Sequence, residues 1–156
     1  MPDMLVKLYT LPPLAPLIAI QHTAGVTIRR ALAPERHLVL DWVSQHFDAG
    51  WTSECAVAFA RQPIACWLAV REQTVLGFAC YDVTARGFFG PTGVAPTAQG
   101  QGIGKVLLVA ALHSLAASGY AYAIIGGVGP AEFYAAAVGA TIIPDSDPGI
   151  YAGLLG

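Results

Sequence analysis

The stretch VAPTAQGQGIGKVLL, residues 94–108, decides the fold of this chain. An extended apolar segment ends at Val94, Pro96 follows, and a glycine-rich loop then leads into a helical pattern. The apolar residues recur at helical spacing, at Ile103, Val106, Leu107, Ala110, Ala111 and Leu115. The stretch therefore predicts a strand, a loop and a helix. Because amides at a helix start lack partners and glycines admit a ligand to the backbone, the loop is a candidate anion-binding site.

Two well-known phosphate-binding motifs do not match this loop. A Walker loop needs a glycine where Gln99 stands and a metal-binding hydroxyl where Val106 stands. The dinucleotide fingerprint needs its third glycine where Lys105 stands. These mismatches argue against a nucleoside triphosphatase and against a dinucleotide-binding protein.

The composition indicates one domain that associates with itself. The chain has 156 residues, enough for one domain with a substantial core. Only 12% of the residues are charged and 55% are hydrophobic, which leaves few charges to cover a monomer surface and predicts a homodimer. The net charge of −2 gives no support for binding nucleic acid or a membrane surface.

The three cysteines are interpreted as small buried hydrophobic residues. Cys55, Cys66 and Cys80 lie singly in apolar surroundings, with no Cys-x-x-Cys pair. They predict a reduced, cytoplasmic chain with no metal site.

Residues 1–24 are expected to form an N-terminal arm, and residues 25–156 a single domain. The apolar run over 5–20 is interrupted by Lys7 and three prolines, so it resembles neither a secretory signal nor a bilayer span. Residues 14–21 could form one short helix. We expect this arm to pack on the domain or on a partner subunit.

The first half of the domain is predicted as follows. A strand at 26–31 precedes a helix over 38–47 that Gly50 ends, and Thr52 or Ser53 caps a second helix that stops before Pro63. Segments 65–70 and 75–83 form a hairpin around the turn 71–74, and their continuous apolar runs suggest helices over both faces. The strand at 88–94 contains Gly90 and Pro91, which predict a bulge.

The second half continues the alternation of helices and strands. The helix that begins in the glycine-rich loop stops at Ser118-Gly119, and a strand over 120–125 follows. Pro130 and Gly139 bracket a helix at 131–138. Segments 141–143 and 151–155 are predicted as the final strands.

Two motifs resemble those of the GNAT superfamily of N-acyltransferases, especially bacterial members. Gln99-x-x-Gly102-x-Gly104 after Val-x-Pro is similar to the acetyl-CoA signature, and Glu132-Phe133-Tyr134 to a second motif beside the cofactor thiol. Ala140 stands where the family often has an aromatic residue, and glycines replace an asparagine near residues 126–127. The resemblance, from about residue 26 onward, implies an α/β (α+β) fold. It also implies a mixed, mostly antiparallel twisted sheet of about six to seven strands, helices on both faces and a cofactor cleft between two splayed parallel strands.

The resemblance also implies a site for acetyl-CoA as co-substrate, without metal. The backbone of the loop would bind the pyrophosphate, and a backbone N–H of Val94 or Ala95 would polarise the thioester carbonyl. Tyr134 would donate a proton or hydrogen bond to the leaving thiolate. The candidate cofactor-binding residues are Val94, Ala95, Gln99, Gly100, Gln101, Gly102, Ile103, Gly104, Lys105, Pro130, Phe133 and Tyr134.

The acceptor would be a primary amine of a small molecule or peptide that attacks the thioester directly. The helices near residues 38–60 would lie on its side, which makes Trp42, His46, Trp51 and Glu54 candidate acceptor contacts. An ammonium acceptor must lose a proton, and Glu54 and Asp82 are the candidate bases, with Glu132 also considered. The alternatives are a non-catalytic acyl-CoA sensor and an interaction module.

Overall fold

The computed structural model describes residues 1–156 and is built around one seven-stranded sheet with the order β2-β3-β4-β5-β6-β1-β7. The strands are β1 (Met4–Lys7), β2 (Thr27–Arg30), β3 (Cys66–Arg71), β4 (Thr74–Tyr81), β5 (Phe88–Val94), β6 (Tyr122–Ile125) and β7 (Thr141–Ile142). Every neighbouring pair is antiparallel except β5 and β6. The predicted mixed, mostly antiparallel sheet is therefore confirmed.

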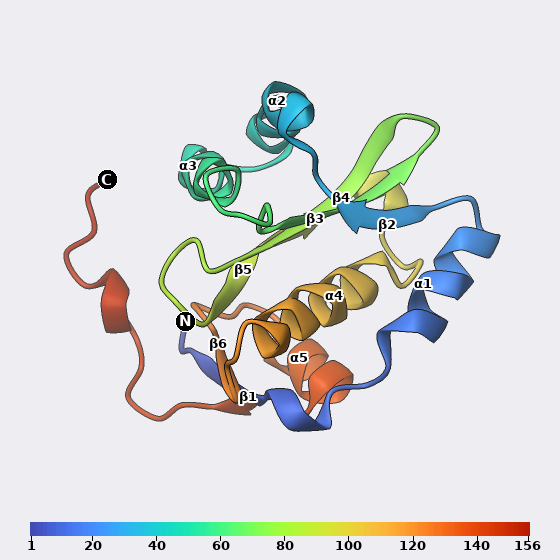
Figure 1. The fold of residues 1–156 in the computed structure, drawn as a ribbon. Helices are drawn as coiled ribbons and strands as arrows, with labels where there is room; N and C mark the ends of the chain where they lie inside the picture. The colour runs from blue at the N-terminus through green and yellow to red at the C-terminus, as the bar shows by residue number, and fades with distance from the viewer.

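Helices cover both faces of the sheet, as Figure 1 shows. The α-helices are α1 (Leu14–Thr23), α2 (Arg36–His46), α3 (Ala49–Ala58), α4 (Ile103–Ala117) and α5 (Ala131–Val138). Helices α2 and α3 lie on one face, and α1, α4 and α5 on the other. Four short 3₁₀ helices lie at Leu8–Thr10, Ala33–Glu35, Pro96–Ala98 and Gly149–Tyr151. No helix is long and apolar enough to cross a bilayer.

The core is centred on α4 and the middle strands. Nearly all of α4 is buried, including Leu107, Leu108 and Leu112, because this helix packs across β3, β4 and β5. On the other side of the sheet, Phe78 of β4 is fully buried beneath an aromatic group from α2 and α3. Burial on both faces explains why β3 and β4 show continuous apolar runs instead of alternation.

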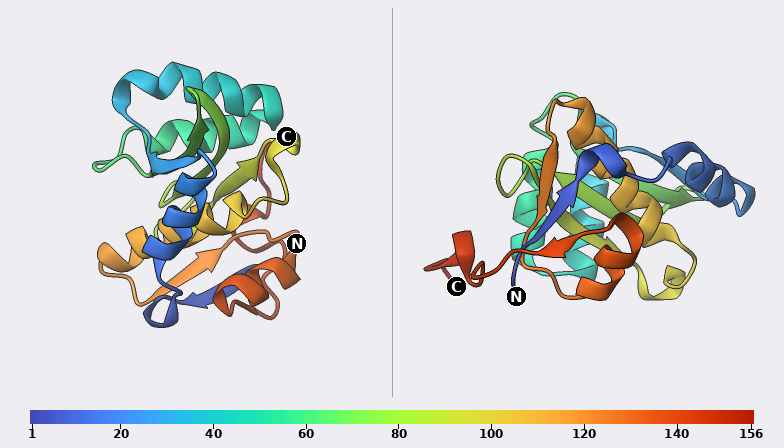
Figure 2. Two further views of the ribbon diagram at one scale, coloured as in Figure 1. Left: turned by 90° about the vertical axis from the view of Figure 1, so that its right-hand side faces the viewer. Right: turned by 90° about the horizontal axis from the view of Figure 1, so that it is seen from below.

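The N-terminal segment supplies a strand that the sequence did not reveal. Strand β1 lies between β6 and β7 and pairs antiparallel with both, as the view from below in Figure 2 shows. The carboxylate of Asp3 also accepts the Gly127 N–H at 2.8 Å, in the region after β6 where the family asparagine is missing. The short helix expected behind the prolines is present as α1.

Three local predictions were wrong. Gly50 does not end a helix but lies inside α3, and the cap is Asp48 instead of Thr52 or Ser53. The reason is chemical, since the Asp48 carboxylate accepts the Trp51 N–H at 2.8 Å and so satisfies a free amide of the first turn. The final strand predicted at 151–155 is absent, and this segment follows the 3₁₀ turn Gly149–Tyr151.

The bulge predicted in β5 is present and bears on the site. Ala79 faces Thr92 while Tyr81 faces Phe89, so β5 carries one residue more than β4 over this interval. The extra residue falls at Gly90 and Pro91, and Gly90 has a φ of +116°, which favours glycine.

Candidate functional site

The site is centred on the point where β5 and β6 separate. Their parallel pairing consists of two residue pairs, Phe88 with Ile124 and Phe89 with Ile125. Beyond them β6 ends, while β5 continues through the bulge to Val94. The second half of β5 therefore has β4 on one side and no strand on the other.

The end of β5 directs one backbone donor into this opening. The Ala95 N–H is occupied, because it donates to the Leu76 carbonyl at 2.8 Å. Hydrogen bonding alternates along an antiparallel ladder, so the neighbouring Val94 N–H points away from β4. Of the two amides that the sequence offered for the thioester carbonyl, Val94 is the one directed toward the opening.

The glycine-rich loop presents a row of free amides at the start of α4. The amides from Gln101 to Lys105 donate to no group within the chain. Gly100 and Gly102 both have a φ of +78°, a conformation that glycine adopts without the steric cost of a side chain. Free amides together with the helix dipole produce partial positive charge that attracts an anion.

Helix α1 supports this loop from behind. The side-chain amide of Gln21, which is only 5% exposed, donates to the Gln101 carbonyl at 2.8 Å. A Cβ built on Gly102 would lie 3.2 Å from the same Gln21 nitrogen, so the two residues fit closely. Sequence reasoning did not identify Gln21, and a polar residue at the end of an otherwise apolar helix was the available signal.

Three elements meet at Gly104 in the first turn of α4. A Cβ built on Gly104 would lie 3.8 Å from Val94 Cγ2 and 3.9 Å from Phe133 Cζ. The structure thus brings together the end of β5, the loop and α5, as the motifs predicted. Pro130 directly precedes α5, and Gln99 and Lys105 are exposed at the rim of the loop.

Tyr134 is buried on α5 and leaves its hydroxyl free. Its ring packs edge-on against Phe89, the last residue of β5 that pairs with β6, with ring centroids 6.3 Å apart. The hydroxyl makes no hydrogen bond with the chain. Burial raises the pKa of Tyr134, so the phenol keeps its proton at neutral pH and remains a donor.

Three of the four predicted acceptor contacts, Trp42, His46 and Trp51, form one aromatic group on the opposite face of the sheet. Trp42 and His46 stack with centroids 4.4 Å apart, and Trp51 lies 4.9 Å from Phe47, which links the two helices. Phe47 reaches β5, since a Cβ on Gly93 would lie 2.2 Å from Phe47 Cζ. Phe47 was not among the predicted contacts, although Gly93 in a strand signals such a close approach.

The two candidate bases both bond to the turn between β4 and β5. Glu54 of α3 accepts a hydrogen bond from the Thr84 hydroxyl and, with Asp3, contributes to the raised pKa of Tyr151, for which burial is the main cause. The Asp82 carboxylate instead accepts the Gly87 N–H at 2.7 Å and closes the turn before β5, at the opposite end of that strand from Val94. The hydroxyl of Tyr151 lies close to Gly126, since a Cβ built on Gly126 would lie 2.5 Å from it.

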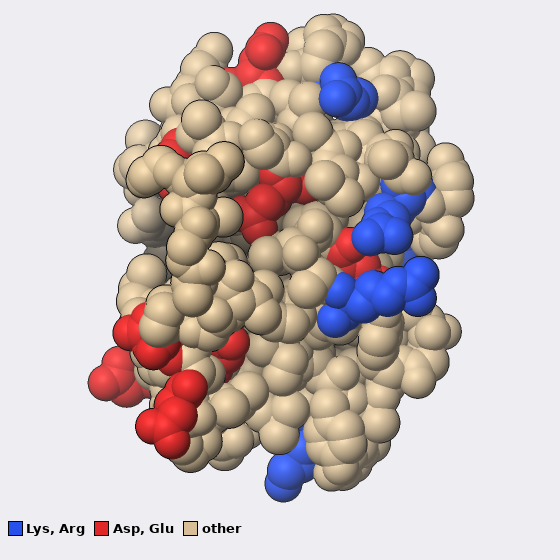
Figure 3. Space-filling model, turned by 90° about the vertical axis from the view of Figure 1, so that its left-hand side faces the viewer, with Lys and Arg blue, Asp and Glu red and all other residues tan.

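The face that carries α3 and the C-terminal segment bears charges of both signs. Acidic side chains lie at its top, centre and lower left, and basic side chains lie along the right and at the bottom, with an acidic group among those on the right (Figure 3).

The family comparison agrees with this geometry. The model of the acetyltransferase (GNAT) family matches residues 33–138, so the chain belongs to this family. The matched segment runs from the start of α2 to the end of α5, and it includes the loop, Val94 and Tyr134. No curated protein matches the sequence.

Solved structures show the same fold at low sequence identity. A glucosamine N-acetyltransferase region of a fungal multidomain β-N-acetylglucosaminidase has a TM-score of 0.73 and 14% identity, over 91% of this chain and 19% of that one. A GCN5-related N-acetyltransferase from Sphaerobacter thermophilus has a TM-score of 0.66 and 20% identity, over 91% and 48%. One from Kribbella flavida has a TM-score of 0.55 and 19% identity, over 80% and 46%. The chain thus spans less than half the length of these proteins.

Proposed function

We propose that this chain transfers an acetyl group from acetyl-CoA to a primary amine of a small molecule or peptide. The observation that carries the proposal is the row of free amides from Gln101 to Lys105 at the start of α4, beside the separation of β5 and β6. A pyrophosphate would accept hydrogen bonds from these amides, and its charge would interact favourably with the helix dipole. The pantetheine arm would then follow β5 toward Phe89 and Tyr134.

The reaction would be a direct attack with both substrates bound. The amine nitrogen forms a bond to the thioester carbonyl carbon, and the C–S bond breaks as the tetrahedral intermediate collapses. Holding both reactants in one site supplies much of the rate acceleration. The Val94 N–H would stabilise the negative charge on the carbonyl oxygen, and the Tyr134 hydroxyl would donate to the departing sulfur.

The acceptor would enter from the face formed by α2 and α3. The aromatic group of Trp42, His46, Phe47 and Trp51 offers apolar surface, and the carboxylate of Glu54 would attract a cationic amine. Glu54 and Asp82 are both candidate bases, since Glu54 is bonded to Thr84 and Asp82 to Gly87 in the turn before β5. The proton of the ammonium would leave to one of these carboxylates, directly or through water.

The decisive assay measures release of free CoA thiol from acetyl-CoA with mixtures of amines. Thiol release that depends on an amine supports the enzyme. Binding of CoA without thiol release would favour the acyl-CoA sensor, and absence of binding would favour the interaction module.

The Tyr134→Phe variant tests the mechanism. Loss of one such proton donor typically lowers kcat by roughly 10²–10⁴-fold at full effect, and we expect about 10–10³-fold here. CoA affinity should change little, because the ring and its contact with Phe89 remain. Full turnover by Tyr134→Phe would remove Tyr134 from the mechanism.

A further inference from the structure

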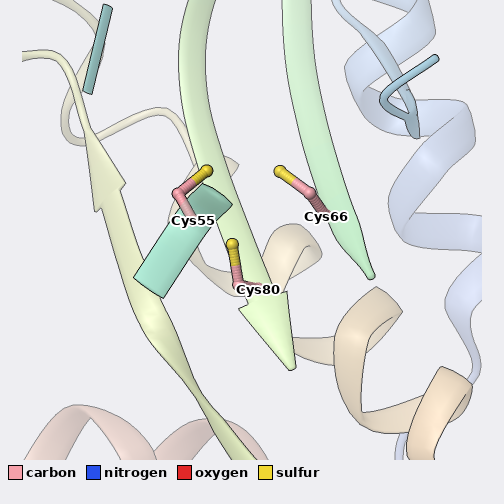
Figure 4. A group of neighbouring side chains, drawn as sticks. All are labelled: Cys55, Cys66 and Cys80. Atoms are coloured by element: carbon pink, nitrogen blue, oxygen red, sulfur yellow. The ribbon is translucent and has the colours of Figure 1, made fainter. Parts of the chain in front are cut away.

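Three cysteine side chains that are far apart in the sequence converge in the core. Cys55 comes from α3, Cys66 from β3 and Cys80 from β4, and each is 0% exposed. Their sulfur atoms all lie within 4.8 Å of one another, and Figure 4 shows the three thiols pointing toward a common space. Cys66 and Cys80 face each other directly across the β3–β4 ladder.

The spacing suits an ion bound by three sulfur atoms. Thiolate sulfur binds soft ions at about 2.3 Å, so three sulfurs around a pyramidal ion with S–ion–S angles near 100° lie about 3.5 Å apart. The thiols, at most 4.8 Å apart, would need to approach by up to about 1.3 Å, which χ1 rotations of about 30° can supply. No histidine or carboxylate joins the group, so the donors are sulfur alone and favour a soft ion.

Charge narrows the choice of ion. Arg36 and Glu35, the charged side chains that act on the group, have opposite signs.

A buried trithiolate that stayed negatively charged would be costly. Three thiolates around a monovalent or divalent ion retain two or one negative charges in a dry interior, where an unpaired charge costs several kcal/mol. Three thiolates around a trivalent ion have no net charge. The charge of three thiolates is thus balanced by a trivalent thiophilic ion.

We propose that Cys55, Cys66 and Cys80 form a buried binding site for a trivalent thiophilic metalloid ion of the arsenite type. Arsenous acid, As(OH)₃, would exchange its three hydroxyl groups for three sulfurs, breaking three As–O bonds and forming three As–S bonds. Each hydroxyl leaves as water with one proton, taken from a thiol. Arsenic stays trivalent throughout, so no oxidant or reductant is required.

Binding would also tie α3 to the sheet. Cys55 follows Glu54 and lies one turn after Trp51, so an ion in this site would fix the helix that carries two candidate acceptor contacts. The proposal does not depend on the acetyltransferase function, because the three thiols lie in the core and outside the loop.

The test adds arsenite to the reduced protein, both in the native state and during refolding, since the site is closed to solvent. We expect one arsenic per chain by native mass spectrometry and a higher thermal midpoint. We also expect arsenite to protect all three thiols from an alkylating reagent at a urea concentration that unfolds the arsenite-free protein. Cys55→Ala, Cys66→Ala and Cys80→Ala should each bind arsenite at least about tenfold more weakly, because only two sulfurs remain.

Several results would overturn the proposal. They are no arsenic bound under either condition, protection of only two thiols, equal affinity in the wild type and the single variants, or preferential retention of Cd(II) over arsenite. Should a variant not fold, the stoichiometry and thiol count of the wild-type protein decide the question. A matched control is Ser118→Ala, which leaves the three thiols in place and should bind arsenite like the wild type.

Discussion

Gly93→Ala tests the contact between α2–α3 and β5 on which the acceptor side depends. The added Cβ would lie 2.2 Å from Phe47 Cζ and 2.8 Å from both Cε atoms. Carbon atoms normally approach to about 3.5–4.0 Å, so the Phe47 ring must move by more than about 1 Å. That ring also packs against Trp51, Trp42 and Phe78, so it cannot move without disturbing them.

The expected cost is that of overpacking, about 1–3 kcal/mol. For a domain of this size each kcal/mol lowers the thermal midpoint by roughly 2–4 °C, which predicts a fall of about 2–12 °C. A shift of the Phe47 ring would also displace Trp51, a candidate acceptor contact that packs against it. The KM for the amine acceptor should therefore rise, while the affinity for CoA is unchanged. Thermal unfolding by circular dichroism and steady-state kinetics measure the two effects.

Two further variants make the reasoning refutable. Gly129→Ala is the matched control, because a Cβ there would meet nothing within 4 Å, and it should leave stability unchanged or slightly raised. Phe47→Leu combined with Gly93→Ala should recover part of the loss, with a coupling of about 0.5–3 kcal/mol. A Gly93→Ala protein as stable as Gly129→Ala, or strictly additive double-variant costs, would contradict the proposed contact.

Three other predictions follow from the loop, an ion pair and the composition. Gly104→Glu should abolish CoA binding in calorimetry. Both this variant and Gly104→Ala should fold, since a Cβ at this position meets nothing nearer than 3.8 Å. Unchanged CoA affinity in folded Gly104→Glu would remove the anion site from this loop. The Arg29 guanidinium, 2.6 and 2.8 Å from the Glu35 carboxylate, lowers the pKa of Glu35, so the pair stabilises the fold above the unfolded-state pKa and loses this effect as pH falls through the lower folded-state pKa. Glu35→Gln should therefore cost up to about 1 kcal/mol in urea unfolding at neutral pH, and a cost undiminished at about pH 2, well below the ordinary Glu pKa of about 4.3, would contradict the assignment. With 12% charged residues, an exposed Leu38 on α2 and an exposed Leu32 shortly before that helix, the chain should sediment as a homodimer at micromolar concentration. A monomer across that range would contradict the interpretation.

The local features of the fold were predictable because short-range chemistry determines them. The glycine-rich loop, the bulge at Gly90 and Pro91, and the ends of α4 and α5 each depend on the backbone freedom of glycine or the constraint of proline. The cap of α3 is also local, but Asp48, Thr52 and Ser53 are all capable caps. The choice of Asp48 depended on which amide its carboxylate reaches.

Only the tertiary structure decided the contacts between segments that are distant in the chain. The placement of β1 between β6 and β7, the support of the loop by Gln21 and the reach of Phe47 to Gly93 all depend on how the elements pack. The same is true of the cysteines, whose burial was predicted but whose meeting was not, so the expectation of a chain without metal stays a prediction. By itself the sequence determined where the backbone can turn and bind an anion, because those properties belong to neighbouring residues. Packing determined which side chains share one space, because that depends on the registers and crossings of the sheet and its helices.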